Sequence, residues 1–399
     1  MRSWGKLVYH RCVVSWFWHG VGNPGSWMGE CDFDVIVLGA GPAGATAAIA
    51  LAQKNRSVLL LERAKLPRRI HCGGWLTGLA QPFLSDLGLD TGKVLTMPFR
   101  DVTFYSADFD KKTEPEFDRD VGYIIDRAAF DRALVELATR VGVQFRSEHP
   151  ISDLRLNESG VEAIQPGGES DSARLVVVAT GRGSPWSDAV GVARITGESP
   201  ILNAQVEAKI PKKKSSPTPR VSIVLGLDGG ASFGLIGVTR DRLIMNVNWR
   251  GGADAVNATL IHLCRGAHAA GVAPVDLSRG AASAAVIRSP AAVALDMETH
   301  VGKHALVVGD AGGFVSAASN EGIYPAMWSA KIAAEVIDKA LDSTYVQDEL
   351  MQFNTMWRIA MADHLRSPHT DVRFLLPLIF SNQPMADRMG AAFFFGQNI

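Results

Sequence analysis

Short apolar blocks and helical patterns alternate in the first part of the chain. The apolar runs at 34–38 and 57–61 predict two buried strands, and the stretch 42–54 between them predicts a helix. A strand, a helix and a second strand at this spacing are typical of a parallel sheet. The same patterns return in a helix expected over 127–141, strands expected over 175–179 and 304–310, and a long helix expected over 320–341.

Between these pieces the hydrophobic period changes to two. Residues 201–210 alternate apolar and polar side chains, and strand-like runs follow at 220–226, 232–238 and 242–249. Such alternation favours an antiparallel sheet with one buried face. We therefore predict an α/β protein with a discontinuous domain at 31–195 and 285–342, an inserted antiparallel β-sheet domain at 196–284 and C-terminal helices at 343–399.

The first thirty residues follow neither period. They contain four of the nine tryptophans, and glycines and a proline interrupt their second half. Two interpretations stay open for residues 1–30. Either the native chain starts at Met28, or the segment is an irregular extension that is disordered or docks on a surface.

Composition narrows the functional classes. The chain has 399 residues, 47% of them hydrophobic and 20% charged, which excludes a disordered protein. Its 40 basic and 41 acidic residues nearly cancel, so no overall positive field exists to bind nucleic acid. The lysines at 211–217 predict a solvated hairpin tip. Four scattered cysteines indicate neither a zinc site nor a disulfide scaffold, and we expect no metal and a cytoplasmic setting.

A glycine motif lies at the first strand-to-helix turn. Gly39, Gly41 and Gly44 follow the strand at 34–38 and open the next helix, and the second strand ends at Glu62. This context is typical of dinucleotide binding: the backbone and the helix N-terminus approach a pyrophosphate, and the acidic residue accepts hydrogen bonds from a ribose. The motif alone does not separate FAD from NAD.

Further motifs between 34 and 341 resemble the FAD-dependent oxidoreductases that include the aromatic-ring flavin hydroxylases. The matching segments are the glycine motif, Arg127 in an Asp-Arg-Ala-Ala-Phe stretch, the Gly-Asp-Ala-Gly at 309–312 and the Asn-Glu-Gly-Ile at 320–323. Within this family the chain is most similar to the branch of geranylgeranyl reductases and electron-transfer flavoprotein dehydrogenases. The resemblance implies a Rossmann-like FAD-binding domain, a substrate domain formed by the inserted sheet, and cofactor-binding residues Gly39, Gly41, Pro42, Ala43, Gly44, Glu62, Arg63, Arg127, Ala179, Gly181, Gly309, Asp310, Glu321, Gly322 and Ile323.

The segment at 71–74 resembles the Cys-Gly-Gly stretch of geranylgeranyl reductases, which lies near flavin and substrate. We hypothesise that Cys72 lines the active site and orients substrate or assists proton delivery. The alternative is a small buried residue before a flexible turn.

Four departures from the family restrict the activity. The Ala-Thr-Gly at 179–181 replaces the Ala-Asp-Gly of flavin hydroxylases, and no second glycine motif indicates a nicotinamide domain. The stretch 231–237 lacks the aromatic run ending in Phe-Pro that geranylgeranyl reductases carry, which argues against an isoprenoid substrate. The Trp-x-Trp-x-Ile-Pro signature of flavin halogenases is also missing.

The resemblance thus implies an FAD-dependent oxidoreductase that transfers a hydride between flavin N5 and an unsaturated, apolar or lipid-like substrate. The electron donor, NAD(P)H or a ferredoxin-like electron-transfer protein, is left open. The alternatives are a flavin-dependent monooxygenase or halogenase, and a non-catalytic flavin-binding electron carrier. We expect the apolar residues at 374–380 and 393–395 to pack helices onto the body; the alternatives are that they line a lipophilic entrance or touch a membrane surface.

Overall fold

The parallel sheet predicted from the apolar runs is present. In the computed structural model, which describes residues 31–68, 70, 72–195, 201–211, 218–368 and 370–397, its strands follow the order β17-β18-β11-β1-β2-β8. The contacts between β11, β1, β2, β8 and β18 are all parallel. The strands are β1 (Phe33–Leu38), β2 (Val58–Leu61), β8 (Gln144–Arg146), β11 (Ser170–Val178), β17 (Val301–Gly302) and β18 (Ala305–Val307), with the antiparallel hairpin β9 (Asp153–Leu156) and β10 (Val161–Ile164) added to β11.

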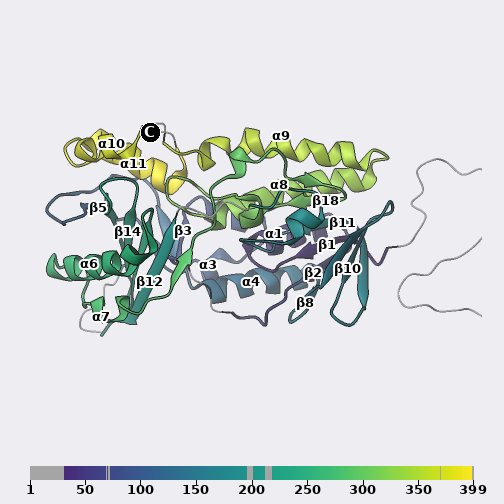
Figure 1. Ribbon diagram of the computed structural model, residues 1–399, viewed down its shortest axis with the longest axis horizontal. Coiled ribbons are helices and arrows are strands. Elements are labelled where there is room, and N and C mark those ends of the chain that lie inside the picture. Colours follow the sequence, from purple (N-terminus) through teal and green to yellow (C-terminus); the bar gives the residue numbers. More distant parts are fainter. Residues whose placement is uncertain are drawn as a thin grey trace, which may run out of the picture.

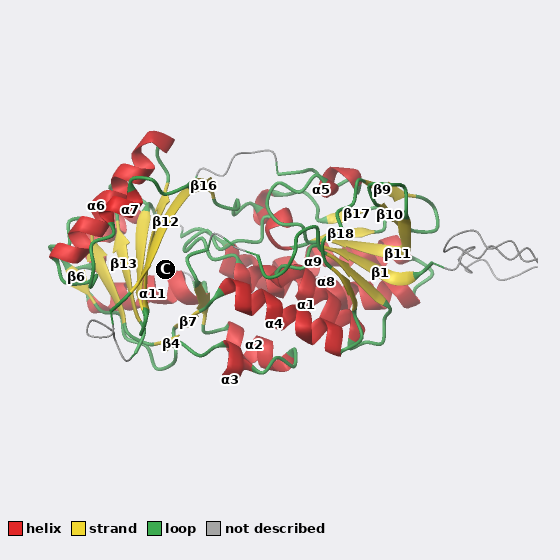
Figure 2. Ribbon diagram, turned by 90° about the horizontal axis from the view of Figure 1, so that it is seen from below, coloured by secondary structure: helices red, strands yellow, loops and turns green. Residues whose placement is uncertain are grey.

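Four helices form a layer against this sheet (Figures 1 and 2). Helix α1 packs on α4 and α8, and α8 packs on α9. Their apolar side chains and those of the sheet form the largest core cluster of the described residues. These helices are α1 (Pro42–Ala52), α4 (Arg127–Arg140), α8 (Ile323–Asp342) and α9 (Val346–Leu365); shorter ones are α2 (Ala80–Asp86), α3 (Thr91–Val94) and α5 (Trp186–Ala189). We call this part the FAD body, after the cofactor that the resemblance implies.

The second sheet forms a separate body at the other end of the molecule (Figure 1). Its order is β16-β12-β15-β14-β13-β5-β6, and the four strands predicted from the period-two segment lie together and antiparallel. The strands are β5 (Val102–Ser106), β6 (Lys112–Thr113), β12 (Leu202–Lys209), β13 (Arg220–Leu225), β14 (Phe233–Val238), β15 (Arg242–Trp249) and β16 (Val286–Arg288), and one face is covered by α6 (Val256–Ala269) and α7 (Ser278–Ala281). We call this part the sheet body.

The sheet body differs from the sequence prediction at one edge. Strand β5 pairs with β13 in a parallel register, so the sheet is mixed and not purely antiparallel. Strands β5 and β6 come from the 31–195 segment, which the sequence prediction assigned to the nucleotide-binding domain. Strand β16 lies in the 285–342 segment, so three strands of the sheet body are outside 196–284, and the domain boundaries stay a prediction.

A small sheet and the C-terminal helices connect the two bodies. The small sheet contains β3 (Trp75–Thr77), β4 (Pro98–Phe99) and β7 (Gly122–Ile124). Helices α10 (Val372–Ile379) and α11 (Gln383–Phe395) pack with it and with β13 and β14 around an apolar cluster. Trp75 stacks on Phe393 in this cluster, and Phe394 meets Trp75 edge to face.

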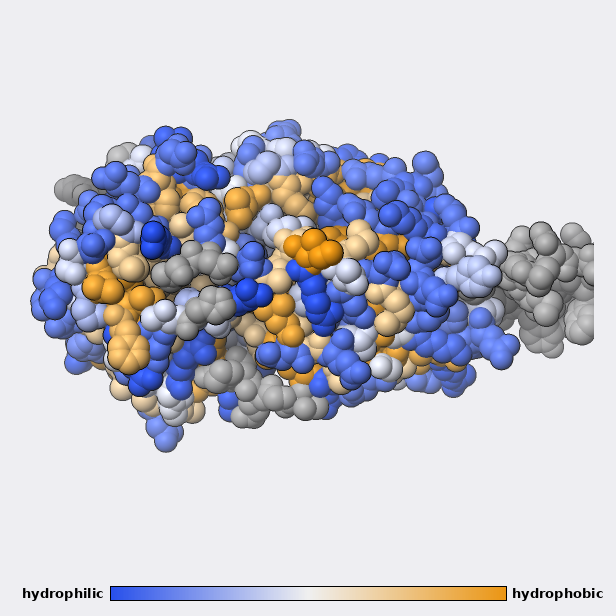
Figure 3. Space-filling view, turned by 90° about the horizontal axis from the view of Figure 1, so that it is seen from above, coloured by the Kyte–Doolittle hydropathy of each residue, from blue (hydrophilic) through white to orange (hydrophobic). Residues whose placement is uncertain are grey.

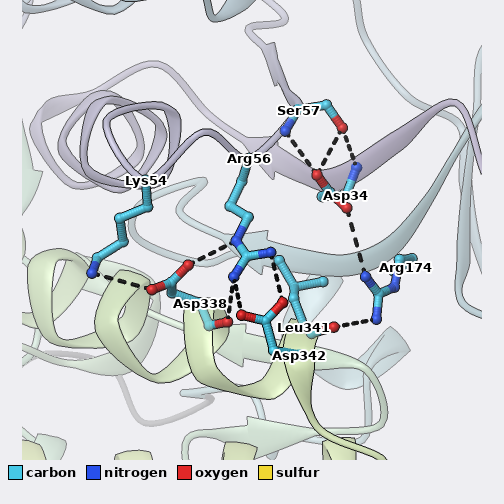
Figure 4. Close-up of polar contacts among 8 residues, drawn as sticks. All are labelled: Asp34, Lys54, Arg56, Ser57, Arg174, Asp338, Leu341 and Asp342. Atoms are coloured by element: carbon cyan, nitrogen blue, oxygen red, sulfur yellow. Dashed lines mark hydrogen bonds and ion pairs between the residues drawn. The ribbon is translucent and has the colours of Figure 1, made fainter.

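An ionic network ties the C-terminal end of α8 to the beginnings of β1 and β2 (Figure 4). Arg56 donates to the carboxylate of Asp338 at 2.7 Å and to that of Asp342 at 2.7 and 2.9 Å. Arg174 donates to the carbonyl oxygen of Leu341 at 2.6 Å. The cations thus meet the negative end of the helix dipole as well as the carboxylates.

Exposed apolar side chains lie on the two helices at the top of the molecule. Ile359 of α9 is 82% exposed, and Phe374 of α10 is 73% exposed. Figure 3 shows this face, where apolar patches are separated by polar groups. No helix within the described ranges is both long and apolar enough to cross a membrane. Contact of this face with a membrane surface stays a prediction.

Some predictions fall outside the described residues. These are the segment 1–30 with its tryptophans and proposed start, His71, and most of the lysine loop at 211–217.

Candidate functional site

The glycine turn between β1 and α1 leaves an open helix N-terminus. Gly39 has φ = +100°, and a Cβ there would lie 2.5 Å from the carbonyl oxygen of Ala179. A Cβ at Gly44 would collide with the carbonyl oxygen of Gly39, so helix and strand touch directly. Gly41 caps α1 without a side chain, and Pro42 follows it. The first turn of α1 therefore presents backbone N–H groups and a positive dipole end to an anion.

Glu62 lies at the end of β2, where the sequence predicts it. Its buried carboxylate accepts hydrogen bonds from the N–H of Ala40 at 3.1 Å and of Ala64 at 2.9 Å. It also forms an ion pair with Arg68. Arg63 is exposed beside it. Arg68 was not predicted from the sequence. Its Nη2 lies 3.7 Å from the position that a Cβ at Gly41 would take, so it adds positive charge at the glycine turn.

Arg127 is the first residue of α4. The N-cap residue Asp126 accepts hydrogen bonds from the N–H groups of Ala128 and Ala129, which fixes the start of the helix. The Arg127 guanidinium donates to the buried Asp131 at 3.1 and 3.3 Å. Burial by itself would lower the pKa of Arg127, but the neighbouring Cys72 and Asp131 raise it above its ordinary value. Arg127 therefore keeps its positive charge inside the protein.

The Gly-Asp-Ala-Gly segment at 309–312 lies against the glycine turn. A Cβ at Gly309 would lie 2.9 Å from the Cβ of Ala43, in the first turn of α1. The Gly309 N–H donates to the hydroxyl of Ser329 at 3.1 Å. Desolvation raises the pKa of Asp310 to about 6, and the charges of Arg127 and Arg182 oppose the shift. Two segments that lie far apart in the sequence thus meet at one place.

The start of α8 is the third segment at this place, next to Asp310. The helix begins at Ile323 and not at Asn320, whose φ is +57°. A Cβ at Gly322 would lie 3.2 Å from Oδ1 of Asp310. Glu321 is buried, and its Oε1 accepts a hydrogen bond from the N–H of Tyr324 at 2.8 Å. Burial raises the pKa of Glu321 to about 7, and among the described residues its Oε2 has no hydrogen-bond partner.

Ala179 lies directly against the glycine turn, and Gly181 follows it two residues later in the chain. Ala179 is buried behind Gly39, and its N–H donates to the carbonyl oxygen of Leu38 at 2.9 Å. Gly181 has φ = +78° and no neighbour at the position of a Cβ. Ala179 therefore shapes the turn through its backbone.

A cleft of about 570 Å³ separates the beginning of α4 from β12 and β15. Cys72 lines it and lies beside Arg127. The Sγ of Cys72 accepts a hydrogen bond from the N–H of Gly74 at 3.5 Å. The predicted active-site cysteine is thus within the cleft; other lining residues include Arg68, Ile125, Gln205, Glu207, Arg242, Ile244 and Arg279.

These features fit a dinucleotide with a buried ring system. The open N-terminus of α1 and the charges of Arg68 and Arg127 suit a pyrophosphate. The unpartnered Oε2 of Glu321, just before α8, leaves a buried acceptor for a ring that carries a hydrogen-bond donor. In the described parts of the chain, no cluster of acidic residues, histidines and cysteines could hold a metal ion.

Comparison with known proteins gives one family and several relatives. The family described as FAD dependent oxidoreductase matches residues 34–255, more than half of the chain. Digeranylgeranylglycerophospholipid reductase 1 of Methanococcoides burtonii is 34% identical over 160 residues, which cover 38% of this chain and 38% of that protein. The 1H-pyrrole-2-carbonyl-[peptidyl-carrier protein] chlorinase of Pseudomonas fluorescens is 30% identical over 172 residues, 37% of this chain and 36% of that protein. The matched part therefore spans well under half the length of these relatives.

Among solved structures, a geranylgeranyl bacteriochlorophyll reductase-like protein of Thermoplasma acidophilum has the same fold. Its TM-score is 0.69 at 15% identity, with 91% of this chain and 96% of that chain covered. The predicted fold class and the resemblance are confirmed by these matches.

Proposed function

Because this chain belongs to the FAD dependent oxidoreductase family and is therefore an FAD-dependent enzyme, we propose that it reduces a carbon–carbon double bond of a substrate held between the two bodies. The observation that carries the proposal is the meeting of the glycine turn, Asp310 and the start of α8 beside a cleft lined by Cys72. The reductase named above supports this reaction over the alternatives.

We assign the FAD-binding residues by the groups that each can offer. The first turn of α1, around Pro42 and Ala43, and Arg127 suit the pyrophosphate, and Glu62 suits the ribose of the adenosine. Asp310 suits the ribityl hydroxyls, and the N–H groups at Gly322 and Ile323 suit the pyrimidine edge of the ring. When bound, FAD supplies a two-electron carrier that gives or accepts hydride at N5.

The residues of the chain contribute charge, position and protons. The positive end of α8 stabilises negative charge at the ring edge beside it. Glu321 suits the role of a proton carrier, because its pKa of about 7 lets it hold or release a proton near neutral pH. Cys72, held beside Arg127 at the cleft, orients the substrate or delivers a proton.

The substrate class comes from the relatives. Their printed names include a reductase of a lipid with isoprenoid chains, which supports an unsaturated substrate with an apolar or lipid-like skeleton. The chlorinase among the relatives supports a second candidate, a flavin-dependent halogenase or monooxygenase.

Absorbance spectroscopy followed by anaerobic titration tests the proposal. We expect the purified protein to be yellow, to be reduced by NAD(P)H or a ferredoxin system, and to be reoxidised without oxygen by an unsaturated substrate. Turnover that requires oxygen would favour the halogenase or monooxygenase. Reduction and reoxidation by protein partners alone would indicate an electron carrier. A colourless protein that does not take up FAD would contradict all three.

A further inference from the structure

The face of the sheet body that looks toward the FAD body has an apolar half. On β14, Phe233 and Leu235 belong to the cluster that contains Trp75 and the C-terminal phenylalanines. The rings of Phe233 and Phe393 lie 5.1 Å apart. This half of the face is therefore filled by α11 and β3, which leaves little room there for an apolar substrate.

The other half carries amide side chains. In the register of β12 and β15, Asn203 is opposite Asn248 and Gln205 is opposite Asn246. The residues between them, Ala204 and Val247, pack toward α6 on the other face. Because side chains alternate along a strand, the four amides lie together on the face toward the FAD body.

Hydrogen bonds extend these amides to the start of α8. Asn248 Oδ1 accepts from Asn320 Nδ2 at 2.9 Å and from Asn203 Nδ2 at 3.4 Å. Asn248 Nδ2 donates to Asn246 Oδ1 at 3.3 Å. We call Asn203, Gln205, Asn246, Asn248 and Asn320 the amide row. Its last member directly precedes Glu321.

The row also reaches the segment of Cys72. A Cβ at Gly73 would lie 2.7 Å from Nδ2 of Asn246, so the amide packs directly against the backbone of this glycine. Gln205 lines the same cleft as Cys72. The amide row therefore extends between the two segments that we assign to the active site.

Two acceptors of the row lack a donor. Among the described residues, Oε1 of Gln205 and Oδ1 of Asn320 are buried without a hydrogen-bond partner. A buried polar atom left unpaired is costly, and most such atoms in folded proteins are paired. A hydrocarbon cannot satisfy these atoms, and the row itself contains no charge to match an anion.

We propose that the amide row is a substrate subsite that binds an uncharged group with N–H donors, such as a carboxamide or a lactam. The inference rests on the proposed function and makes it more specific: the substrate has an apolar, unsaturated skeleton and one such polar group. A site that hydrogen-bonds a polar group of its substrate strongly rejects an analogue that lacks this polar group. An apolar pocket discriminates much less between substrates that differ slightly in size.

A matched pair of compounds tests the subsite. Cinnamamide and trans-β-methylstyrene share the unsaturated skeleton, and a methyl group replaces the carboxamide in the second. We expect calorimetric titration of the FAD-loaded protein to show at least about tenfold tighter binding of cinnamamide. Gln205→Leu and Asn246→Leu should each lose most of this preference. Gln352→Leu, on the exposed side of α9, is the matched control and should keep it.

Retained FAD and an unchanged melting temperature establish that each variant is folded; Asn203→Leu replaces Asn246→Leu if the latter loses FAD. Equal binding of the two compounds, binding of neither, or a preference that survives in the row variants would overturn the subsite. These results leave the proposed function standing as long as the protein takes up FAD and is reduced. Failure to take up FAD overturns the proposed function instead.

Discussion

At the scale of single residues, Arg127 has the greatest influence on the proposed FAD site. Its guanidinium is buried, paired with Asp131 and next to Cys72. Arg127→Met should weaken FAD binding by roughly tenfold to a hundredfold, because a hydrogen bond to a charged group contributes about 1.5–3 kcal/mol. Fluorescence titration of the apoprotein measures this loss.

The control for that variant lies on the same helix. Arg132 is exposed on α4, so Arg132→Met should bind FAD as the wild type does. Because Arg127→Met leaves Asp131 buried without its partner, the double variant with Asp131→Asn separates lost affinity from lost stability. Normal FAD affinity in the folded double variant would contradict the assignment.

The burial of His300 predicts that the folded protein loses stability in acid. It is fully buried, and its Nε2 donates to the carbonyl oxygen of Gly312 at 2.7 Å. Burial lowers the pKa of His300 to about 4 from its ordinary 6.5. The unfolded chain therefore binds a proton first as the pH falls, so this stabilisation is present above pH 6.5 and is lost as the pH falls toward 4.

Urea unfolding at pH 7 and pH 5 checks this behaviour. The difference between the two midpoints should be smaller in His300→Gln than in the wild type. It should not vanish, since burial also lowers the pKa of His364 to about 4. His262→Gln, at an exposed position of α6, should leave the difference unchanged. An unchanged difference in His300→Gln as well would contradict the role of His300.

Residues with a fixed local spacing were the ones that the sequence could predict. The glycines at 39, 41 and 44 and the motif at 309–312 belong to short patterns whose geometry follows from the backbone. Arg68, Asp131 and the amide row were missed. They become neighbours of the site only through folding, and no short pattern marks them.

At the scale of elements, the network of Figure 4 holds the end of α8 against the first strands. Arg56 reaches two carboxylates and the backbone carbonyl of Asp338, and its side chain is only 18% exposed. Arg56→Ala should lower the free energy of unfolding by about 1–3 kcal/mol, because two acidic side chains lose their partner.

Lys54 provides the comparison. It has one ion pair with Asp338, and 40% of its side chain is exposed. Lys54→Ala should therefore change the free energy of unfolding by less than about 1 kcal/mol. Chemical denaturation of both variants measures the difference. Equal effects would show that the network contributes no more than an ordinary surface pair.

Elements also show where sequence prediction fails. The predicted strands at 34–38, 57–61 and 242–249 are present because continuous or alternating apolar runs carry their own signal. Strand β5 was missed because its partner β13 is remote in the sequence, and β6 was missed because it is a two-residue strand that pairs with β5. Helix α8 begins later than its pattern predicted, since Asn320 adopts a left-handed conformation.

At the scale of the whole molecule, the chain passes repeatedly between the two bodies. It leaves the FAD body to form β5 and β6 and returns to form α4. It leaves again to form β12 and the later strands of the sheet body, and it returns to form α8 and α9. It ends in α10 and α11, which lie beside the sheet body (Figure 1). A protease that cuts one of these passages would therefore produce a nicked protein that migrates as one particle in a native gel. The same sample would separate into two fragments only after denaturation.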